Sequence, residues 1–286
     1  MPGEPNDALA FFKLEALGND FMLVDARQRD FEPAPEQVRR WADRRRGVGF
    51  DQLLVLRPSD RPQHHCRVEI HNADGSRAEQ CGNGMRAVAL WLAHRDGADR
   101  ALQLETAGGS VETRYRSDDE ISATLGVPDF DPRAVGLADT PTFPRRFTVD
   151  GKELDVHGAS MGNPHLLVIE DEEPGPQRLD MIGRTLGGHP DLARGANVGL
   201  AVVEAPHRVR LRVYERGAGP TLACGSGASA AAAILLHLGR VEAPVEVIQP
   251  GGTLVVNWPG SGRVLTTTGP ARLVFEGVIR CRTQAA

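Results

Sequence analysis

Residues 79–87 read EQCGNGMRA, and residues 222–230 read LACGSGASA. The two stretches share the pattern Cys-Gly-x-Gly, and their cysteines, Cys81 and Cys224, lie half of the 286-residue chain apart. A sequence that repeats itself at half its own length predicts two similar structural halves. This repeated pattern therefore decides the fold that we expect.

Further matches follow in the same order at nearly the same offset. They pair residues 67–72 (RVEIHN) with 210–215 (RLRVYE), 17–19 (LGN) with 161–163 (MGN), and 51–53 (DQL) with 196–198 (ANV). Because several matches in one order are hard to obtain by chance, we infer two homologous halves. We expect a pseudo-two-fold axis to relate them, so that a ligand between the halves would meet equivalent residues on both sides.

Each half is expected to combine short strands with one buried helix. The pattern predicts strands at 21–25, 53–56 and 67–71, and a hairpin over 110–125. The apolar segments 84–94 and 227–238 predict the two helices. The fold class is therefore α+β, with two similar pseudo-two-fold-related domains, each a curved mixed sheet or barrel around a central helix.

The domain boundary is expected at the Pro- and Gly-containing stretch 126–132 (GVPDFDP), which reads as a linker. The first domain then spans residues 1–126 and the second spans 127–269. We expect the C-terminal strand, about 270–286, to return to the first domain.

Composition excludes several classes of protein. A net charge of −5 argues against a nucleic-acid surface, and no apolar run approaches the roughly 20 residues of a membrane span. The N-terminus has no secretion signal, and the four cysteines form no Cys-x-x-Cys pair, which disfavours a disulfide framework and a metal site. We expect a cytoplasmic protein with reduced thiols, and we expect the arginines between 39 and 46 on the solvated face of a helix.

The position of each repeated cysteine predicts proton-transfer chemistry. A helix N-terminus offers unpaired amides and partial positive charge, which lower a thiol pKa from ~8.5 to roughly 3.5–7.5. A thiolate on one face of a carbon and a thiol on the other can invert a stereocentre. We therefore expect Cys81 and Cys224 to act as base and acid, with helix amides holding the substrate carboxylate and no cofactor.

With these cysteines in place, the sequence resembles the diaminopimelate epimerase family from residue 12 to about residue 280. The matching segments are 17–21, 47–53, 72–75, 80–84, 161–165, 214–219 and 223–227. The resemblance implies a cofactor-independent isomerase that interconverts L,L- and meso-diaminopimelate, on the route to lysine and peptidoglycan precursors.

The resemblance also implies roles for individual residues. It makes Cys81 and Cys224 the acid and base, with His165 and Glu215 assisting their proton transfers. The implied substrate-binding residues are Asn19, Gln52, Asn72, Gly82, Asn83, Asn163, Asn197, Glu215, Arg216, Gly225 and Ser226. Arg216 suits a distal carboxylate, and Glu215 suits an ammonium group.

Two positions and two alternative functions stay open. Pro220 stands where the family usually has glutamate, which puts the geometry of the loop before Cys224 in question. Phe275 matches a position where the family often places an aromatic at a dimer contact, so we expect a homodimer, although a buried core phenylalanine fits equally well. The alternative functions are a proline- or hydroxyproline-type racemase of related fold and a non-catalytic amino-acid binder.

Overall fold

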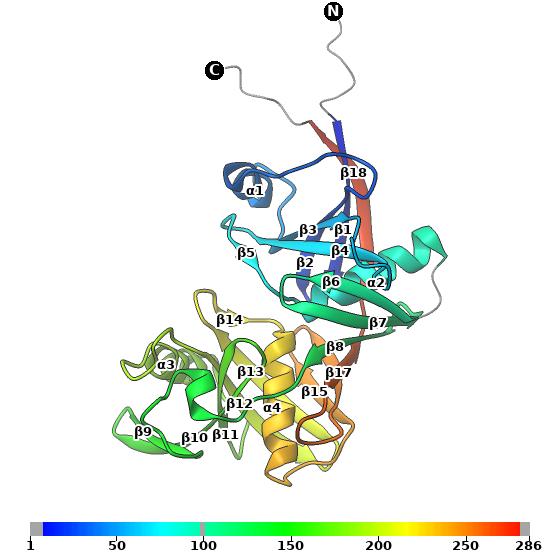
Figure 1. Ribbon diagram of the computed structural model, residues 1–286. Coiled ribbons are helices and arrows are strands. Elements are labelled where there is room, and N and C mark those ends of the chain that lie inside the picture. The colour runs from blue at the N-terminus through cyan, green and yellow to red at the C-terminus, as the bar shows by residue number, and fades with distance from the viewer. Residues whose placement is uncertain (1–7, 98–100, 281–286) are drawn as a thin grey trace, which may run out of the picture. The chain divides into compact units, whose positions relative to one another are not determined.

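The computed structural model describes residues 8–97 and 101–280, which divide into two compact units (Figure 1). Unit 1 contains the described residues as far as Ile121 together with those from Pro270 onward, and unit 2 is Ser122–Gly269. The division lies within β8 (Glu120–Gly126), the strand that ends at the predicted boundary. Residues 281–286 of the predicted C-terminal strand, including Cys281, lie outside the described residues.

Unit 1 is a mixed sheet in the pairing order β18–β1–β2–β3–β4–β6–β7, in which β2–β3 and β4–β6 are parallel and the other pairs antiparallel. Figure 1 shows β18 beside β1, where Ala8 pairs with Arg280. The strands are β1 (Ala8–Ala16), β2 (Asn19–Asp25), β3 (Gln52–Arg57), β4 (Cys66–Asn72), β5 (Arg77–Ala78), β6 (Ala101–Thr106), β7 (Gly109–Ser117) and β18 (Arg272–Arg280). The helices of this unit are α1 (Pro35–Ala42) and α2 (Gly82–Asp96).

Unit 2 repeats this pairing scheme in the order β9–β10–β11–β12–β13–β15–β16–β17, with β11–β12 and β13–β15 parallel. Its strands are β9 (Arg145–Val149), β10 (Lys152–Ser160), β11 (Pro164–Ile169), β12 (Asn197–Ala205), β13 (Arg208–Glu215), β14 (Gly219–Thr221), β15 (Val245–Gln249), β16 (Gly252–Asn257) and β17 (Leu265–Gly269). Its helices are α3 (Pro176–Gly187) and α4 (Gly225–His237), with a 3₁₀ turn at Pro132–Val135. The small β5 and β14 occupy matching places, each antiparallel to the strand before the buried helix.

The buried helices α2 and α4 are those that the repeat predicts, and each begins directly after its cysteine. All residues from Gly82 to Leu92 are buried, and α4 packs against β10–β13 and β15–β17. A helix that is apolar on every side is stable only when protein surrounds it. The predicted α+β class is confirmed. No helix in the described part of the chain is long and apolar enough to cross a membrane.

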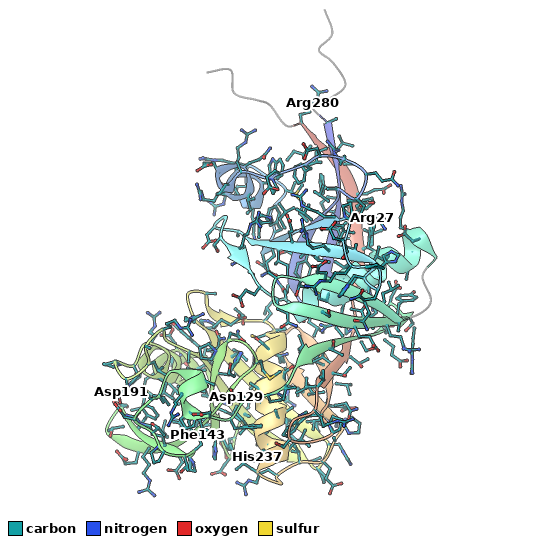
Figure 2. The ribbon with its side chains drawn as sticks, viewed as in Figure 1. Arg27, Asp129, Phe143, Asp191, His237 and Arg280 are labelled. Carbon is teal, nitrogen blue, oxygen red and sulfur yellow. The ribbon has the colours of Figure 1, made fainter. Side chains whose placement is uncertain are left out.

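The ends of these helices are held by ring contacts. Arg27 lies 5.3 Å over the Trp91 ring and donates to Asp96 at 2.6 Å, at the C-terminal end of α2. His237, at the C-terminal end of α4, stacks on Phe130 with ring centroids 4.6 Å apart; Arg27 and His237 are labelled in Figure 2. The contact with Phe130 joins the stretch 126–132, predicted as a linker, to α4 within unit 2.

Helix α3 is not among the elements expected from the sequence. Its residues Leu179, Ile182 and Leu186 are buried on one face, which packs against β12 and β13. Gly183 allows this approach, because a Cβ there would lie 2.3 Å from Cγ of Tyr214 on β13. Close helix–sheet contact therefore requires a residue without a side chain at this position.

We expect Gly183→Ala to lower the free energy of unfolding by about 1–3 kcal/mol, since overpacking forces the ring or the helix to move. Gly175→Ala, at the start of the same helix, is the control, because its Cβ would meet only the end of Gln177 at 3.8 Å. Urea denaturation of both variants measures the difference. Equal stability of the two variants would show that α3 does not need the close contact.

Candidate active site

In unit 1, Cys81 is the residue immediately before the first turn of α2. Its Sγ accepts a hydrogen bond from the Gly84 amide at 3.4 Å. The Gly82 and Asn83 amides come earlier in the turn, where the helix offers no acceptor. A Cβ on Gly84 would lie 3.3 Å from the Leu54 side chain, a tight contact, and 3.5 Å from Sγ, so glycine lets this turn pack closely on β3. The thiol thus lies beside two amides available to an anion.

A charged network orients Asn19 toward this thiol. Asn19 Oδ1 is 3.8 Å from Cys81 Sγ, while Asn19 Nδ2 donates to Asp51 at 2.9 Å. Arg44 bridges Asp51 and Asp20 with contacts of 2.7–2.8 Å. Burial raises the pKa of Asp20, but hydrogen bonds from Arg44 and Lys13 outweigh it and hold that pKa at about 2. The expectation that Arg44 only lines a solvated helix face is wrong, because Arg44 follows α1 and binds carboxylates from distant segments.

Gln52 and Asn72 lie opposite each other on β3 and β4. Gln52 Nε2 donates to Asn72 Oδ1 at 3.0 Å, and Asn72 Nδ2 donates to Ser76 Oγ at 3.0 Å. Within the described residues, the buried Gln52 Oε1 has no hydrogen-bond partner. This oxygen is an acceptor that a bound ammonium group would satisfy.

In unit 2, Cys224 caps α4 in the same way. Its Sγ accepts from the Gly227 amide at 3.3 Å and lies 3.6 Å from Ser226 Oγ. The Cys224 amide donates to the Gln249 side chain at 2.9 Å. A Cβ on Gly227 would lie 3.2 Å from this sulfur, an even closer approach than at Gly84.

The electrostatic surroundings of Cys224 oppose ionisation. Burial, followed by the negative charge of Glu215, raises the pKa of the Cys224 thiol. Glu215 Oε1 accepts from Thr221 Oγ1 at 2.7 Å, which fixes this carboxylate on β13. The sequence led us to expect that the helix N-terminus would lower both thiol pKa values. For Cys224 that expectation is wrong, because loss of water and a nearby carboxylate outweigh the helix.

His165 connects to the same helix end through Asn163. His165 Nε2 and Asn163 Oδ1 are 2.9 Å apart, and Asn163 Nδ2 donates to Ser226 Oγ at 3.3 Å. Burial, with a smaller contribution from the positive charge of Arg216, lowers the pKa of His165 to about 3. A neutral His165 that donates from Nε2 fits this chain of contacts.

Asn197 and Arg216 complete the residues placed in unit 2. Asn197 Oδ1 accepts from the Arg216 amide at 2.9 Å, and Arg216 Nη1 donates to the Arg194 carbonyl at 2.8 Å. Arg216 as a whole is exposed to solvent. The sequence-predicted residues thus form two sets of direct contacts, one in each unit. The residues that sequence reasoning missed are Arg44, Asp51, Thr221 and Gln249.

Known proteins match this chain over the segments that contain the site residues of both units. The profile of the family described as diaminopimelate epimerase matches residues 11–130 and 158–274. A diaminopimelate epimerase of Stutzerimonas stutzeri is 40% identical over 275 residues, 95% of this chain and 99% of the relative. One of Azotobacter vinelandii is 41% identical over 276 residues with the same coverage. The chain belongs to the diaminopimelate epimerase family.

Membership of the diaminopimelate epimerase family confirms the family, the epimerase function and the isomerase class expected from the sequence. A crystal structure of a hydroxyproline epimerase from Agrobacterium vitis has a TM-score of 0.71 and covers 99% of this chain and 95% of its own. Its sequence is only 18% identical, so the likeness shows a shared fold.

Pro220 is the residue whose effect on the loop before Cys224 the sequence left open. It lies in β14 opposite Tyr214, and Thr221 beside it retains the hydrogen bond to Glu215. The Pro220 side chain is exposed. Proline is tolerated in a strand at a position where the backbone amide does not have to donate a hydrogen bond. The antiparallel pairing of β14 with β13, just before Cys224, therefore forms with Pro220 in place.

We expect His165 to make folding sensitive to acid. Its pKa is about 3 in the folded state against an ordinary 6.5, so the unfolded state binds the extra proton and stability falls as the pH drops from about 6.5 toward 3. Wild type should therefore lose more stability than His165→Gln between pH 7 and pH 4.5, measured by urea denaturation. The exposed His207→Gln is the control and should behave as wild type; equal losses in wild type and His165→Gln would contradict the argument.

Proposed function

We propose that this protein interconverts L,L- and meso-diaminopimelate by a two-base mechanism, with Cys81 and Cys224 as the proton-transfer groups. The observation that carries the proposal is the matching capping of α2 and α4, in which each sulfur accepts from the third helical amide. Each unit thus supplies one thiol beside one anion-binding helix end. A duplicated pair of such groups suits a reaction that is symmetric about one carbon.

In this mechanism the thiolate of one cysteine takes the α-proton of the substrate. The electron pair of the broken C–H bond is delocalised into the α-carboxylate, which the Gly82, Asn83, Gly225 and Ser226 amides stabilise. The thiol of the other cysteine gives its proton to the opposite face, and the stereocentre is inverted. The charge now lies on the other sulfur, so the reverse reaction starts with exchanged roles and the atoms balance without a cofactor.

The remaining polar groups suit the second amino-acid head of diaminopimelate. The fork of the exposed Arg216 matches a carboxylate, and Asn197 fixes the Arg216 backbone. The unpartnered Gln52 Oε1 and the nearby Asn72 offer acceptors to an ammonium group. Asn19 Oδ1 lies beside the Cys81 sulfur. The His165–Asn163 pair contacts Ser226 at the N-terminal end of α4, and the Glu215 carboxylate faces Cys224.

Cys81→Ala and Cys224→Ala should each reduce epimerisation at least about a hundredfold, because each removes one of the two proton carriers. Cys66→Ala is the control: burial raises the pKa of Cys66 to about 12, so this thiol stays protonated and takes no part. The measurement is deuterium incorporation at the α-carbon of L,L-diaminopimelate in heavy water, followed by mass spectrometry.

The same assay separates the alternatives. Exchange with proline or hydroxyproline but not with diaminopimelate would make the protein a racemase of the related type. Tight binding of diaminopimelate without any exchange in the wild type would make it a non-catalytic binder.

We also propose that the protein works in the cytoplasm, within lysine and peptidoglycan-precursor synthesis. The mechanism requires Cys81 and Cys224 as two reduced thiols. Thiols remain reduced in a reducing compartment.

We further propose a homodimer that covers β18. Leu273, Val274, Phe275 and Val278 of this strand are exposed, with Phe275 at 47% and Val278 at 66%. Side chains alternate between the two faces of a regular strand, so exposure of Phe275 and Val278, which are three residues apart, means that both faces are open. Such an apolar strip is typical of a protein interface, and the family resemblance expects an aromatic dimer contact at Phe275.

Phe275→Asp should convert the dimer to a monomer, because it places a charge in the apolar strip. Val264→Asp changes an equally exposed apolar residue of unit 2 and should leave the dimer intact. Sedimentation velocity measures both variants. A monomeric wild type, or a dimeric Phe275→Asp, would remove β18 as the interface.

A further inference from the structure

Arg44 lies in the loop that follows α1, and its guanidinium joins two carboxylates of unit 1. Its Nη1 and Nη2 donate to Asp20 Oδ2 and Oδ1 at 2.8 and 2.7 Å, which is the two-nitrogen geometry of a strong arginine–carboxylate pair. Its Nη2 also donates to Asp51 Oδ1 at 2.8 Å. One planar group therefore holds Asp20 and Asp51 in a fixed relation, which the single nitrogen of a lysine does not reproduce.

The loop is shaped so that Arg44 lies against its backbone. Gly49 has a φ of +72°, and a Cβ there would lie 3.0 Å from Cα and 3.1 Å from Cγ of Arg44. The Gly49 amide donates to the Trp41 carbonyl at 2.9 Å, and Lys13 Nζ donates to the Gly49 carbonyl. Arg44 therefore starts from a fixed backbone position, although its side chain is 58% exposed.

Asp51 connects Arg44 to Asn19. While Asp51 Oδ1 accepts from Arg44, its Oδ2 accepts from Asn19 Nδ2 at 2.9 Å. The backbone amides of Asp20 and Asp51 each donate to the other carboxylate, at 3.2 and 3.0 Å. A carboxylate paired with arginine only accepts hydrogen bonds, so the Asn19 side chain must present its nitrogen to Asp51. The Asn19 oxygen is then the atom left for Cys81, and it lies 3.8 Å from Sγ.

Unit 2 holds its matching asparagine by other means. In the repeat, Asn163 matches Asn19. Ala196 matches Asp51, and an alanine side chain offers no acceptor. Asn163 Oδ1 instead lies 2.9 Å from His165 Nε2. Both units therefore fix the side-chain amide of this asparagine, and unit 1 does so with a carboxylate.

We propose that Arg44 is a positioning residue for the epimerisation, which it serves by keeping the Asn19 oxygen beside the Cys81 sulfur. The inference rests on the proposed function for its catalytic meaning. Without Arg44, Asp20 and Asp51 are neighbouring like charges that repel each other. Asp51 then turns away, and Asn19 loses the acceptor that orients its amide.

The first measurement is the side-chain amide signal of Asn19 in ¹H–¹⁵N NMR spectra of the whole, substrate-free protein, assigned by its loss in Asn19→Ala. The signal should move to higher field in Arg44→Met, because the amide protons lose a strong bond to an ionised acceptor. The control is Arg45→Met, since Arg45 is an exposed neighbour in the same loop whose amide donates to Asp43, and it should leave the signal in place. An unmoved signal in a folded Arg44→Met, or an equal shift in both variants, overturns the proposal.

The second measurement is a double-mutant cycle on the rate of α-deuterium exchange at saturating L,L-diaminopimelate. Arg44→Met should lower this rate about tenfold, because a reacting group is no longer held in place, and Arg45→Met should retain the wild-type rate. In an Asn19→Ala background, Arg44→Met should change the rate less than about twofold, because the side chain that Arg44 positions is already absent. A tenfold loss in that background as well would mean that Arg44 does not act through Asn19.

If Arg44→Met does not fold, Arg44→Lys takes its place in both measurements, because it retains the charge and gives up the fork. A wild-type Asn19 signal and rate in Arg44→Lys would then refute the role of the fork. If Asn19→Ala has no measurable exchange, the NMR signal decides. The proposed function is scored separately: a wild type that does not exchange diaminopimelate, but whose Asn19 signal depends on Arg44, refutes only the proposed function.

Discussion

The hydrogen bond from a helix amide to a cysteine sulfur, made at Gly84 and again at Gly227, is the interaction on which the rest of this structure depends. It needs a cysteine just before the helix and a glycine as the third helical residue, where a Cβ would lie 3.2 Å from the sulfur at Gly227 and 3.3 Å from the Leu54 side chain at Gly84. It leaves the first two amides of the helix for an anion. The strands of each unit surround the helix and hold this end in place.

The two units share the backbone arrangement of the site but differ in the side chains that surround it. The parallel registers Phe21 with Gln52 and His165 with Asn197 occupy the same place in the two units. One unit therefore has a phenylalanine where the other has a buried neutral histidine. Likewise Arg86 and Ser229 stand at matching positions of α2 and α4. Two sites that share a fold thus differ in the polar and charged side chains around them.

The helices and strands could be predicted from the sequence where a short segment carries the pattern that specifies them. The repeat and the apolar periodicity placed β2–β4, α2 and α4, because such elements follow from the spacing of apolar residues along a short segment. Helix α3 was missed, since its buried face consists of only three large residues beside a glycine. The role of Arg44 was also missed, because Asp20 and Asp51 come from segments far away in the chain.

By itself the sequence determined the duplication, the family and the identity of the polar site residues, because motifs and their spacing along the chain reveal all three. Only the tertiary structure decided the electrical environment of each residue. Cys224 begins a helix just as Cys81 does, yet burial and Glu215 raise its pKa, and burial makes His165 neutral. The free energy of an ionised group depends on water and charge within a few ångströms, and folding brings those neighbours from distant parts of the chain.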